Sequence, residues 1–245
     1  MGIGNFGWDA VDAESGGGAK KRGTGGPRRF WLPAQVTKRV LFLDENPYTL
    51  YEHSMWALTK KQDREICLKR NKLADECPIC DAEMWPSLTG FFSVIDMGDV
   101  KHEKGKVTLE GWTNDAGQNF QFGRKLLGAK RGGRDKPGML QKIRRLSDKR
   151  GGLVGTVWDV YRSGQKSESI GDEYEFVEVV KEKDIRKYLL KLGAEEEYLE
   201  TTSFNYDEIF VPKTVDELKE IMGVAPENKV TSVDLGDDDD PDFDL

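Results

Sequence analysis

One histidine and all three cysteines of the 245-residue chain fall within a short stretch: His53, Cys67, Cys77 and Cys80. Cys77 and Cys80 are separated by two residues, a Cys-x-x-Cys spacing that lets two sulfurs reach one ion from a tight turn. A closed structural zinc site has four tetrahedral ligands, thiolates with or without imidazole, whereas a catalytic zinc keeps one position for water. The four residues therefore predict one structural Zn²⁺ and an inserted lobe folded around it.

Two other interpretations of the cysteines stay open. They could be small buried hydrophobes, or the pair at 77 and 80 could be a redox motif. A redox Cys-x-x-Cys usually lies where a strand runs into a helix, but here the charged stretch 69–76 precedes it. No enzyme activity is expected, because the other histidine, His102, lies in a polar turn without a carboxylate-histidine motif for a catalytic metal.

Charge divides the chain into two parts. Residues 1–166 carry 29 Lys and Arg against 20 Asp and Glu, and residues 167–245 carry 8 against 24. This opposition predicts a basic body that binds a polyanion and an acidic segment that can compete for the same surface. The chain has no apolar run near 18 residues and no signal peptide at its start, so we expect no membrane partner and a cytosolic location.

β-rich segments at 38–44, 90–97, 106–113, 153–162 and 172–180 predict five strands. Between the third and fourth, residues 118–130 and 136–150 are expected to form two basic helices. The predicted fold class is mainly β with helical additions (α+β). Its core, residues 30–180, is a five-stranded antiparallel barrel with an inserted zinc subdomain at about 48–90 and a basic helical connection at about 118–150.

The two ends of the chain differ from this core. Residues 1–29 form a flexible, glycine-rich basic arm, whose Phe6 and Trp8 dock on a neighbouring copy or a base, or pack back on their own domain. Residues 181–233 are predicted as an acidic helical region, with a capping box at Thr214 and Glu217 opening its last helix. Residues 234–245 contain seven Asp and are predicted to be disordered.

The basic, aromatic-rich body indicates a groove for a nucleic-acid strand, in which cations contact phosphates and rings stack on exposed bases. From Arg124 to Arg150 there are eleven Lys or Arg against two Asp. Of the neighbouring rings Phe91 and Phe92, one is expected in the core and the other outward. The candidate DNA-binding residues are Trp31, Lys38, Arg39, Trp56, Lys69, Arg70, Lys72, Phe92, Trp112, Phe122, Arg124, Lys125, Lys130, Arg131, Arg134, Arg144, Arg145, Trp158, Tyr161 and Arg162.

The order of these parts resembles the single-stranded DNA-binding proteins of tailed bacteriophages. The resemblance rests on the His, Cys, Cys-x-x-Cys order, the strand Gly90-Phe-Phe-Ser-Val-Ile-Asp96, the basic helices, the segment 161–164 and the terminal Asp run. Among these proteins, the zinc-containing helix-destabilising protein of T-even phages has closely similar ligand spacing. The N-terminal arm departs from that protein, because it has no obvious match to its self-association segment.

The resemblance implies an oligonucleotide/oligosaccharide-binding (OB) barrel with a zinc subdomain held by His53, Cys67, Cys77 and Cys80. It implies a protein without catalytic activity that coats and protects single-stranded DNA during phage replication, recombination and repair, in the cytoplasm of the infected bacterial host, with possible self-association on DNA. The acidic tail would recruit phage replication proteins, such as a polymerase, primase-helicase or recombination factor, and compete for the DNA groove. The tail residues concerned are Asp237, Asp238, Asp239, Asp240, Asp242, Phe243, Asp244 and Leu245.

A zinc-ribbon transcription or protein-interaction module is the alternative. Its metal knuckle would contact a protein or duplex DNA, and it would prefer a defined duplex site. A preference for unpaired strands distinguishes the two functions.

Overall fold

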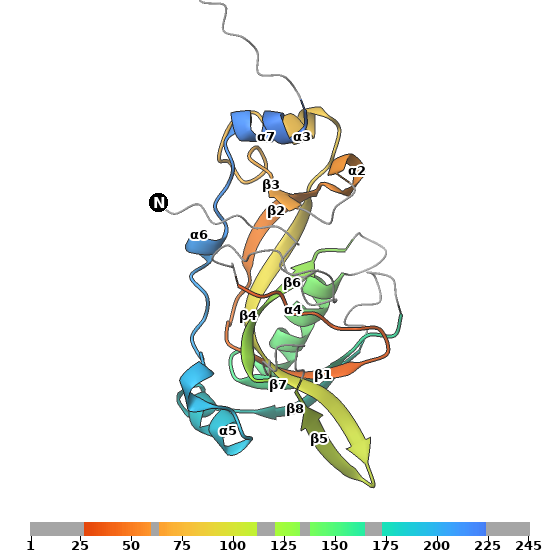
Figure 1. The fold of residues 1–245 in the computed structure, drawn as a ribbon, viewed down its shortest axis with the longest axis vertical. Helices are drawn as coiled ribbons and strands as arrows, with labels where there is room; N and C mark the ends of the chain where they lie inside the picture. The colour runs from red at the N-terminus through yellow and green to blue at the C-terminus, as the bar shows by residue number, and fades with distance from the viewer. Residues whose placement is uncertain (1–26, 60–63, 112–120, 133–137, 165–172, 224–245) are drawn as a thin grey trace, which may run out of the picture.

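The computed structural model describes residues 27–59, 64–111, 121–132, 138–164 and 173–223 (Figure 1). Within these ranges eight strands form one antiparallel sheet with short helices around it. The strands are β1 (Thr37–Phe42), β2 (Tyr48–Ser54), β3 (Arg64–Ile66), β4 (Ser87–Glu103), β5 (Lys106–Glu110), β6 (Gly123–Lys130), β7 (Thr156–Tyr161) and β8 (Glu173–Val179). The helices are α2 (Trp56–Thr59), α3 (Pro78–Asp81), α4 (Met139–Arg150), α5 (Ile185–Lys191), α6 (Tyr206–Ile209) and α7 (Val215–Ile221), with 3-10 turns η2 (Glu182–Asp184) and η3 (Glu196–Tyr198).

The 17-residue strand β4 organises the sheet. Its first part pairs with β2 along one edge and its middle part with β1, while β6 and then β5 pair along the other edge. Gly98, with φ of +102°, lies where β4 passes from β6 to β5, and a Cβ there would meet the Glu110 carbonyl oxygen at 2.3 Å. This long strand therefore joins the upper end of the molecule in Figure 1, with β2 and β3, to the lower end, with β1, β7 and β8.

Both faces of the central strands are buried. On one face Val40 and Phe42 pack with Phe92 and with Ile143 of α4. On the other face Leu41 packs with residues of α5 and of the following segment. Successive strand residues point to opposite faces, so the apolar run 40–43 fills two cores rather than one.

The prediction of a mainly β fold with helical additions is confirmed, but the closed five-stranded barrel is wrong. The eight strands form an open sheet whose strand order runs from β3 to β8. A barrel wall buries its inner face only, whereas α4 and α5 cover opposite faces of this sheet.

The predicted helix at 118–130 is also wrong within the described residues. Gly123–Lys130 forms strand β6, and each of its residues pairs with β4. The composition of this segment suits a helix, but the hydrogen-bonding edge of β4 decides its structure. The second basic helix is confirmed as α4. Strands β2 and β3 were not expected, because this part of the chain was assigned wholly to the insertion.

The C-terminal region contains the expected short helices. Helix α5 forms, and α7 begins with the predicted capping box, in which Thr214 Oγ1 accepts from the Glu217 N–H. Between them, residues 199–213, here called the C-terminal strap, run from α5 past α6 to α7 (Figure 1). The Tyr206 hydroxyl in this strap hydrogen-bonds to Asp44 and to Ser93 of β4. The helices in the described ranges are all too short or too polar to cross a membrane.

Candidate metal centre

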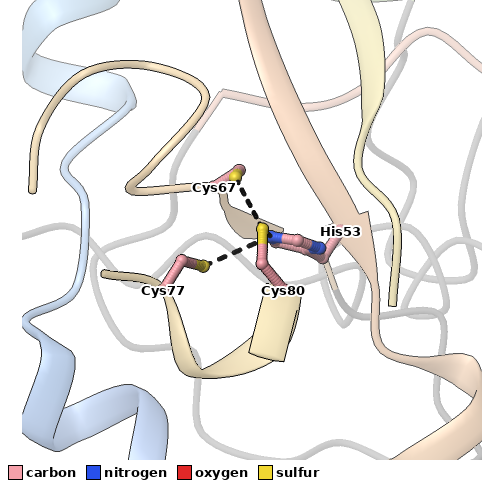
Figure 2. A group of neighbouring side chains, drawn as sticks. All are labelled: His53, Cys67, Cys77 and Cys80. Atoms are coloured by element: carbon pink, nitrogen blue, oxygen red, sulfur yellow. Dashed lines mark hydrogen bonds between the residues drawn. The ribbon is translucent and has the colours of Figure 1, made fainter. Parts of the chain in front are cut away.

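Three short elements bring the four predicted ligands together. His53 lies near the end of β2, Cys67 directly follows β3, and Cys77 caps α3, which contains Cys80. Strands β2 and β3 are antiparallel with His53 opposite Glu65, so Cys67, two residues further on, lies on the same side as the imidazole. Figure 2 shows the four side chains pointing toward one another.

Three of the distances between the ligand atoms match the edges of one tetrahedral ion. The sulfur of Cys77 lies 3.4 Å from His53 Nε2, that of Cys80 lies 3.7 Å from the same nitrogen, and the Cys67 and Cys80 sulfurs are 3.5 Å apart. All four atoms lie within 4.8 Å of one another. Zinc bonds of about 2.0–2.3 Å give a tetrahedron with edges of roughly 3.3–3.8 Å, whereas a disulfide needs about 2.05 Å. The group could therefore bind a metal such as zinc, and the redox alternative gains no support.

Neighbouring backbone and amide groups hold the ligands in place. His53 Nδ1 lies 2.7 Å from the Met84 carbonyl oxygen, which accepts its proton and leaves Nε2 free to bind a cation. The Arg70 N–H donates to the Cys67 sulfur at 3.3 Å. The Asn71 side chain ties the Cys67 carbonyl to the backbone of Tyr51 in β2. These contacts orient the ligands before an ion arrives.

The donor set also calls for a positive charge. Burial raises the pKa of the Cys80 thiol to about 12, and the nearby Cys67 and Cys77 sulfurs add to the rise. Burial likewise raises the pKa of Cys67, whereas at Cys77 neighbouring backbone N–H groups outweigh burial and lower it. Burial lowers the pKa of His53, against the opposing effect of the Met84 hydrogen bond, which favours the neutral, ligating imidazole. A divalent cation is what would allow three thiolates to coexist here.

The surroundings of the four ligands are apolar and closed. Met55, Leu68 and Ile79 are buried beside them, together with Leu218 of α7. His53, Cys67 and Cys77 have no exposed surface. Four candidate ligands in a largely buried site could complete the coordination of a tetrahedral ion, which favours a structural rather than a catalytic role. We call residues 48–59 and 64–85, which surround the site, the metal lobe.

Nine of the twenty candidate DNA-binding residues are exposed. Trp31 and Trp56 show 43% and 54% of their surface. The exposed cations are Lys69, Arg70 and Lys72 on the metal lobe, Lys130 and Arg131 at the end of β6, and Arg144 and Arg145 on α4. Tyr161 is half-buried. These residues remain candidates for contact with a polyanion.

Three of the predicted cations are engaged in ion pairs. Lys38 binds Asp96 at 2.9 Å, and Arg39 makes two hydrogen bonds of 2.7 and 2.8 Å to Asp159. Arg124 is held by the C-terminal strap, where it pairs with Glu200. Each of these charges is already neutralised within the fold, so the structure gives it a stabilising role.

Five further candidates are buried, which corrects the prediction at these positions. Phe92, Phe122 and Trp158 are 2%, 6% and 3% exposed, so none offers a free ring face to a base. Lys125 and Arg162 are buried as well, and Arg162 donates to the Leu32 carbonyl under the ring of Trp31. The remaining candidates lie outside the described residues: Trp112, Arg134 and the tail residues at 237–240 and 242–245.

Sequence reasoning missed two residues at the metal centre. Asn71 and Met84 lie close to the cysteines in sequence, but nothing in their type or spacing distinguishes them. It also missed Arg29 and Arg64, which interact electrostatically with each other, Arg64 also with Lys130 of β6. Pairing of β3 with β2, which the sequence did not predict, positions Arg64 there.

The chain was compared with protein-family models, curated proteins and solved structures, and none of them matches it. The resemblance to phage single-stranded DNA-binding proteins therefore stays a prediction carried by its motif residues.

Proposed function

We propose that this protein binds single-stranded DNA without sequence preference and that one structural zinc ion holds its metal lobe in shape. The observation that carries the proposal is a set of exposed cations with no ion-pair partner among the described residues. They lie on the metal lobe at 69, 70 and 72, at the end of β6 at 130 and 131, and on α4 at 144 and 145. Such charges release counterions when they meet a phosphate backbone.

Helix α4 is the clearest of these surfaces. Its buried residue Ile143 faces the core, whereas Arg144, Arg145, Lys149 and Arg150 are exposed. Asp148 is the only acidic residue in the helix. Arg150 also packs over the Phe176 ring, 3.6 Å from its centroid. A helix that needed only solubility would intersperse both signs of charge, so this composition favours contact with a polyanion.

Exposed tryptophans support an unpaired strand over a duplex. Trp56 lies on the metal lobe, and Trp31, backed by the Arg162 guanidinium, lies before β1. Base stacking on such rings contributes about 1–3 kcal/mol per base, and it requires bases that are free of a partner strand.

Zinc is the metal we propose for the four ligands, because three thiolates and one imidazole suit its preference for soft ligands and tetrahedral geometry. When bound, it would contribute folding free energy to the lobe. His53, Cys67, Cys77 and Cys80 would hold it, and no catalytic step is proposed. The phage setting, the OB relationship of the sheet, self-association on DNA and recruitment of replication proteins by the tail belong to the same proposal and rest on the resemblance.

The test is a fluorescence-anisotropy titration of labelled oligo(dT) and of a duplex of equal length at graded salt, with zinc measured on the purified protein. We expect one zinc per chain, tighter binding to oligo(dT), and a logarithm of affinity that falls linearly with the logarithm of salt concentration. Equal affinity for the duplex would refute the single-strand preference and favour a zinc-ribbon module.

Charge-reversed variants test the surface directly. Arg144→Glu with Arg145→Glu should weaken oligo(dT) binding at least about tenfold, since two phosphate contacts become repulsive. Lys187→Glu with Lys191→Glu on α5 is the matched control, because both lysines are exposed and lie on the acidic part of the chain. Equal losses in both variants would indicate a general charge effect rather than a binding surface.

A further inference from the structure

Four side chains from adjacent strands share one face of the sheet beside the metal lobe. On β2, Glu52 lies opposite Ser87 of β4, and Ser54 lies opposite Arg64 of β3. On β4, Thr89 lies opposite Lys130 of β6. Paired residues point to the same face and residues two apart on a strand do so too. Glu52, Arg64, Thr89 and Lys130 are therefore neighbours on one surface.

Arg29, from the segment before β1, lies across this same face. Its guanidinium stands 5.0 Å from the centre of the Phe91 ring and 3.9 Å from Glu52 Oε1. Gly128 of β6 leaves room for it, because a Cβ there would come within 3.2 Å of Arg29 Nη1. We call Arg29, Arg64 and Lys130 the cationic cluster.

Arg29, Arg64 and Lys130 each interact electrostatically with the same carboxylate, that of Glu52. At 3.9 Å, the Glu52–Arg29 contact is longer than a hydrogen bond. The Lys130 side chain is exposed overall, but desolvation of its ammonium group, followed by the charge of Arg64, lowers its pKa to about 8, although Glu52 acts in the opposite direction. Three cations gathered in a partly desolvated place form a setting that an additional anion suits.

Two buried oxygens in the same place lack hydrogen-bond partners among the described residues. One is Thr89 Oγ1, on a residue that is 3% exposed, and the other is Glu52 Oε2. A buried hydroxyl without a partner costs free energy, and it can donate to a ligand oxygen. Beside three cations, this donor suits an anion with several oxygens.

We propose that the cationic cluster, with the Thr89 hydroxyl, binds a backbone phosphate of the single-stranded nucleic acid. This inference rests on the proposed function and assigns it a phosphate subsite that includes Arg29 and Arg64. A phosphodiester carries one charge and two free oxygens, which three cations and a hydroxyl can surround. Glu52 holds the cations together in the free protein and weakens the attraction for the incoming anion.

The metal would control this subsite through β3. Arg64 begins β3, and the ligand Cys67 directly follows that three-residue strand. Residues 52–54 of β2 pair with 64–66, so both strands of the metal lobe contribute to the cluster. Loss of the metal would release β3 and remove Arg64 from the phosphate.

Salt-dependent anisotropy titrations of oligo(dT) test the subsite. Lys130→Ala should weaken binding about threefold to tenfold and reduce the slope of the log–log salt plot by about 0.7, the contribution of one single-strand phosphate contact. Lys130→Arg should restore both. The exposed residue Lys191 on α5 provides the control, Lys191→Ala, which should keep the wild-type slope.

Glu52→Gln separates binding from a structural role. If Glu52 only stabilises the fold, its loss should weaken binding. If it competes with the phosphate, neutralising it should tighten binding between about twofold and tenfold. Thermal unfolding of each variant shows whether it is folded.

Two ligand changes identify the source of the phosphate. Wild type and Lys130→Ala should bind an oligo(dT) with uncharged methylphosphonate linkages with equal affinity. Excess inorganic phosphate should compete only weakly with ordinary oligo(dT). Strong competition by inorganic phosphate would show a free-anion site instead. Wild-type affinity and slope in Lys130→Ala would overturn the subsite and leave DNA binding standing. Failure of the wild-type protein to bind oligo(dT) at low salt would overturn the proposed function and the subsite with it.

Discussion

Replacing Cys77 by serine should release the metal lobe while leaving the rest of the sheet folded. The Cys77 sulfur is buried and lies 3.4 Å from His53 Nε2. Zinc binding contributes roughly 10–16 kcal/mol in isolated zinc peptides. Loss of one of the four ligands should then cost about 2.5–4 kcal/mol of binding free energy, which lowers zinc affinity by two to three powers of ten.

The apolar cluster around the ligands sets how far the effect spreads. Met55, Leu68, Ile79 and Leu218 are buried together with the cysteines, and the last of these residues belongs to α7. Burial of each such side chain contributes about 1.5–3 kcal/mol to stability, but only while the ligands hold the segments around Cys67 and Cys77 together. The core under α4 contains none of these residues. Local opening should therefore include α7 and stop at the paired part of β2.

Hydrogen exchange followed by mass spectrometry measures this directly. In Cys77→Ser, amides of 64–85 and 215–221 should exchange faster, while those of β1, β4 and β7 keep their protection. Lys72→Ala is the control, because Lys72 is exposed in the same lobe and contributes no ligand. Loss of protection throughout the sheet, or unchanged protection in α7, would refute the reasoning.

Three other substitutions test separate parts of the fold. Leu218→Ala, at a position 1% exposed, should lower the free energy of unfolding by about 2–5 kcal/mol and speed the transfer of zinc to a colorimetric chelator. An unchanged transfer rate would show that packing of α7 does not stabilise the candidate metal centre. Arg39→Met removes the side chain that pairs with Asp159 and should lower the free energy of urea unfolding by about 3–5 kcal/mol, with unchanged oligo(dT) affinity. Weaker binding at unchanged stability would return Arg39 to the proposed DNA-binding surface. Burial and the hydrogen bond to Asp44 raise the pKa of Tyr206 in the folded protein. The neutral Tyr206 hydroxyl therefore contributes its full stabilisation below about pH 10, the pKa of tyrosine in the unfolded chain, and this contribution is lost as pH rises through the folded pKa. Wild type should lose more stability in alkali than Tyr206→Phe, and parallel stability curves would contradict this.

The cluster of candidate metal ligands could be predicted because its chemistry is rare and nearly local. The chain has only three cysteines, and the structure places all of them with His53. The groups that orient the ligands could not be predicted in the same way. The Met84 carbonyl is a backbone atom that any residue supplies, and its position depends on the turn after α3.

The strands of the central sheet were predictable from apolar runs, but their arrangement was not. The run 40–43 is continuous rather than alternating, a pattern typical of strands covered on both faces. Residues 123–130 contain two adjacent leucines between basic residues, which fits a helix or a strand equally well. Pairing with a long β4 decides between them, and the length of β4 becomes visible only in three dimensions.

The exposure of the candidate DNA-binding residues was the least predictable part, because exposure depends on what covers each face. Alternation predicts that one of Phe91 and Phe92 faces outward, yet both are buried. Phe92 packs against Phe42. The C-terminal strap covers Phe91 with the ring of Phe210, whose centroid lies 4.3 Å from that of the Phe91 ring. A segment more than a hundred residues distant in sequence thus removes a candidate stacking ring, which local periodicity cannot detect.

Strand parity would allow one small lobe to hold the proposed metal and the proposed nucleic acid at once. His53 and Glu52 are consecutive on β2, so they point to opposite faces: His53 toward the metal ligands and Glu52 toward the cationic cluster. On β3, Glu65 lies on the metal side and Arg64 on the other. A bound ion would therefore not need to touch DNA to affect the proposed binding, since fixing one face of these two strands fixes the other. The strap strengthens this arrangement, because Lys213 pairs with Glu65 at 2.5 Å just before α7 packs on the metal lobe. A phosphate on one face and a metal on the other should thus stabilise the same pair of strands, and binding of DNA should slow the loss of zinc.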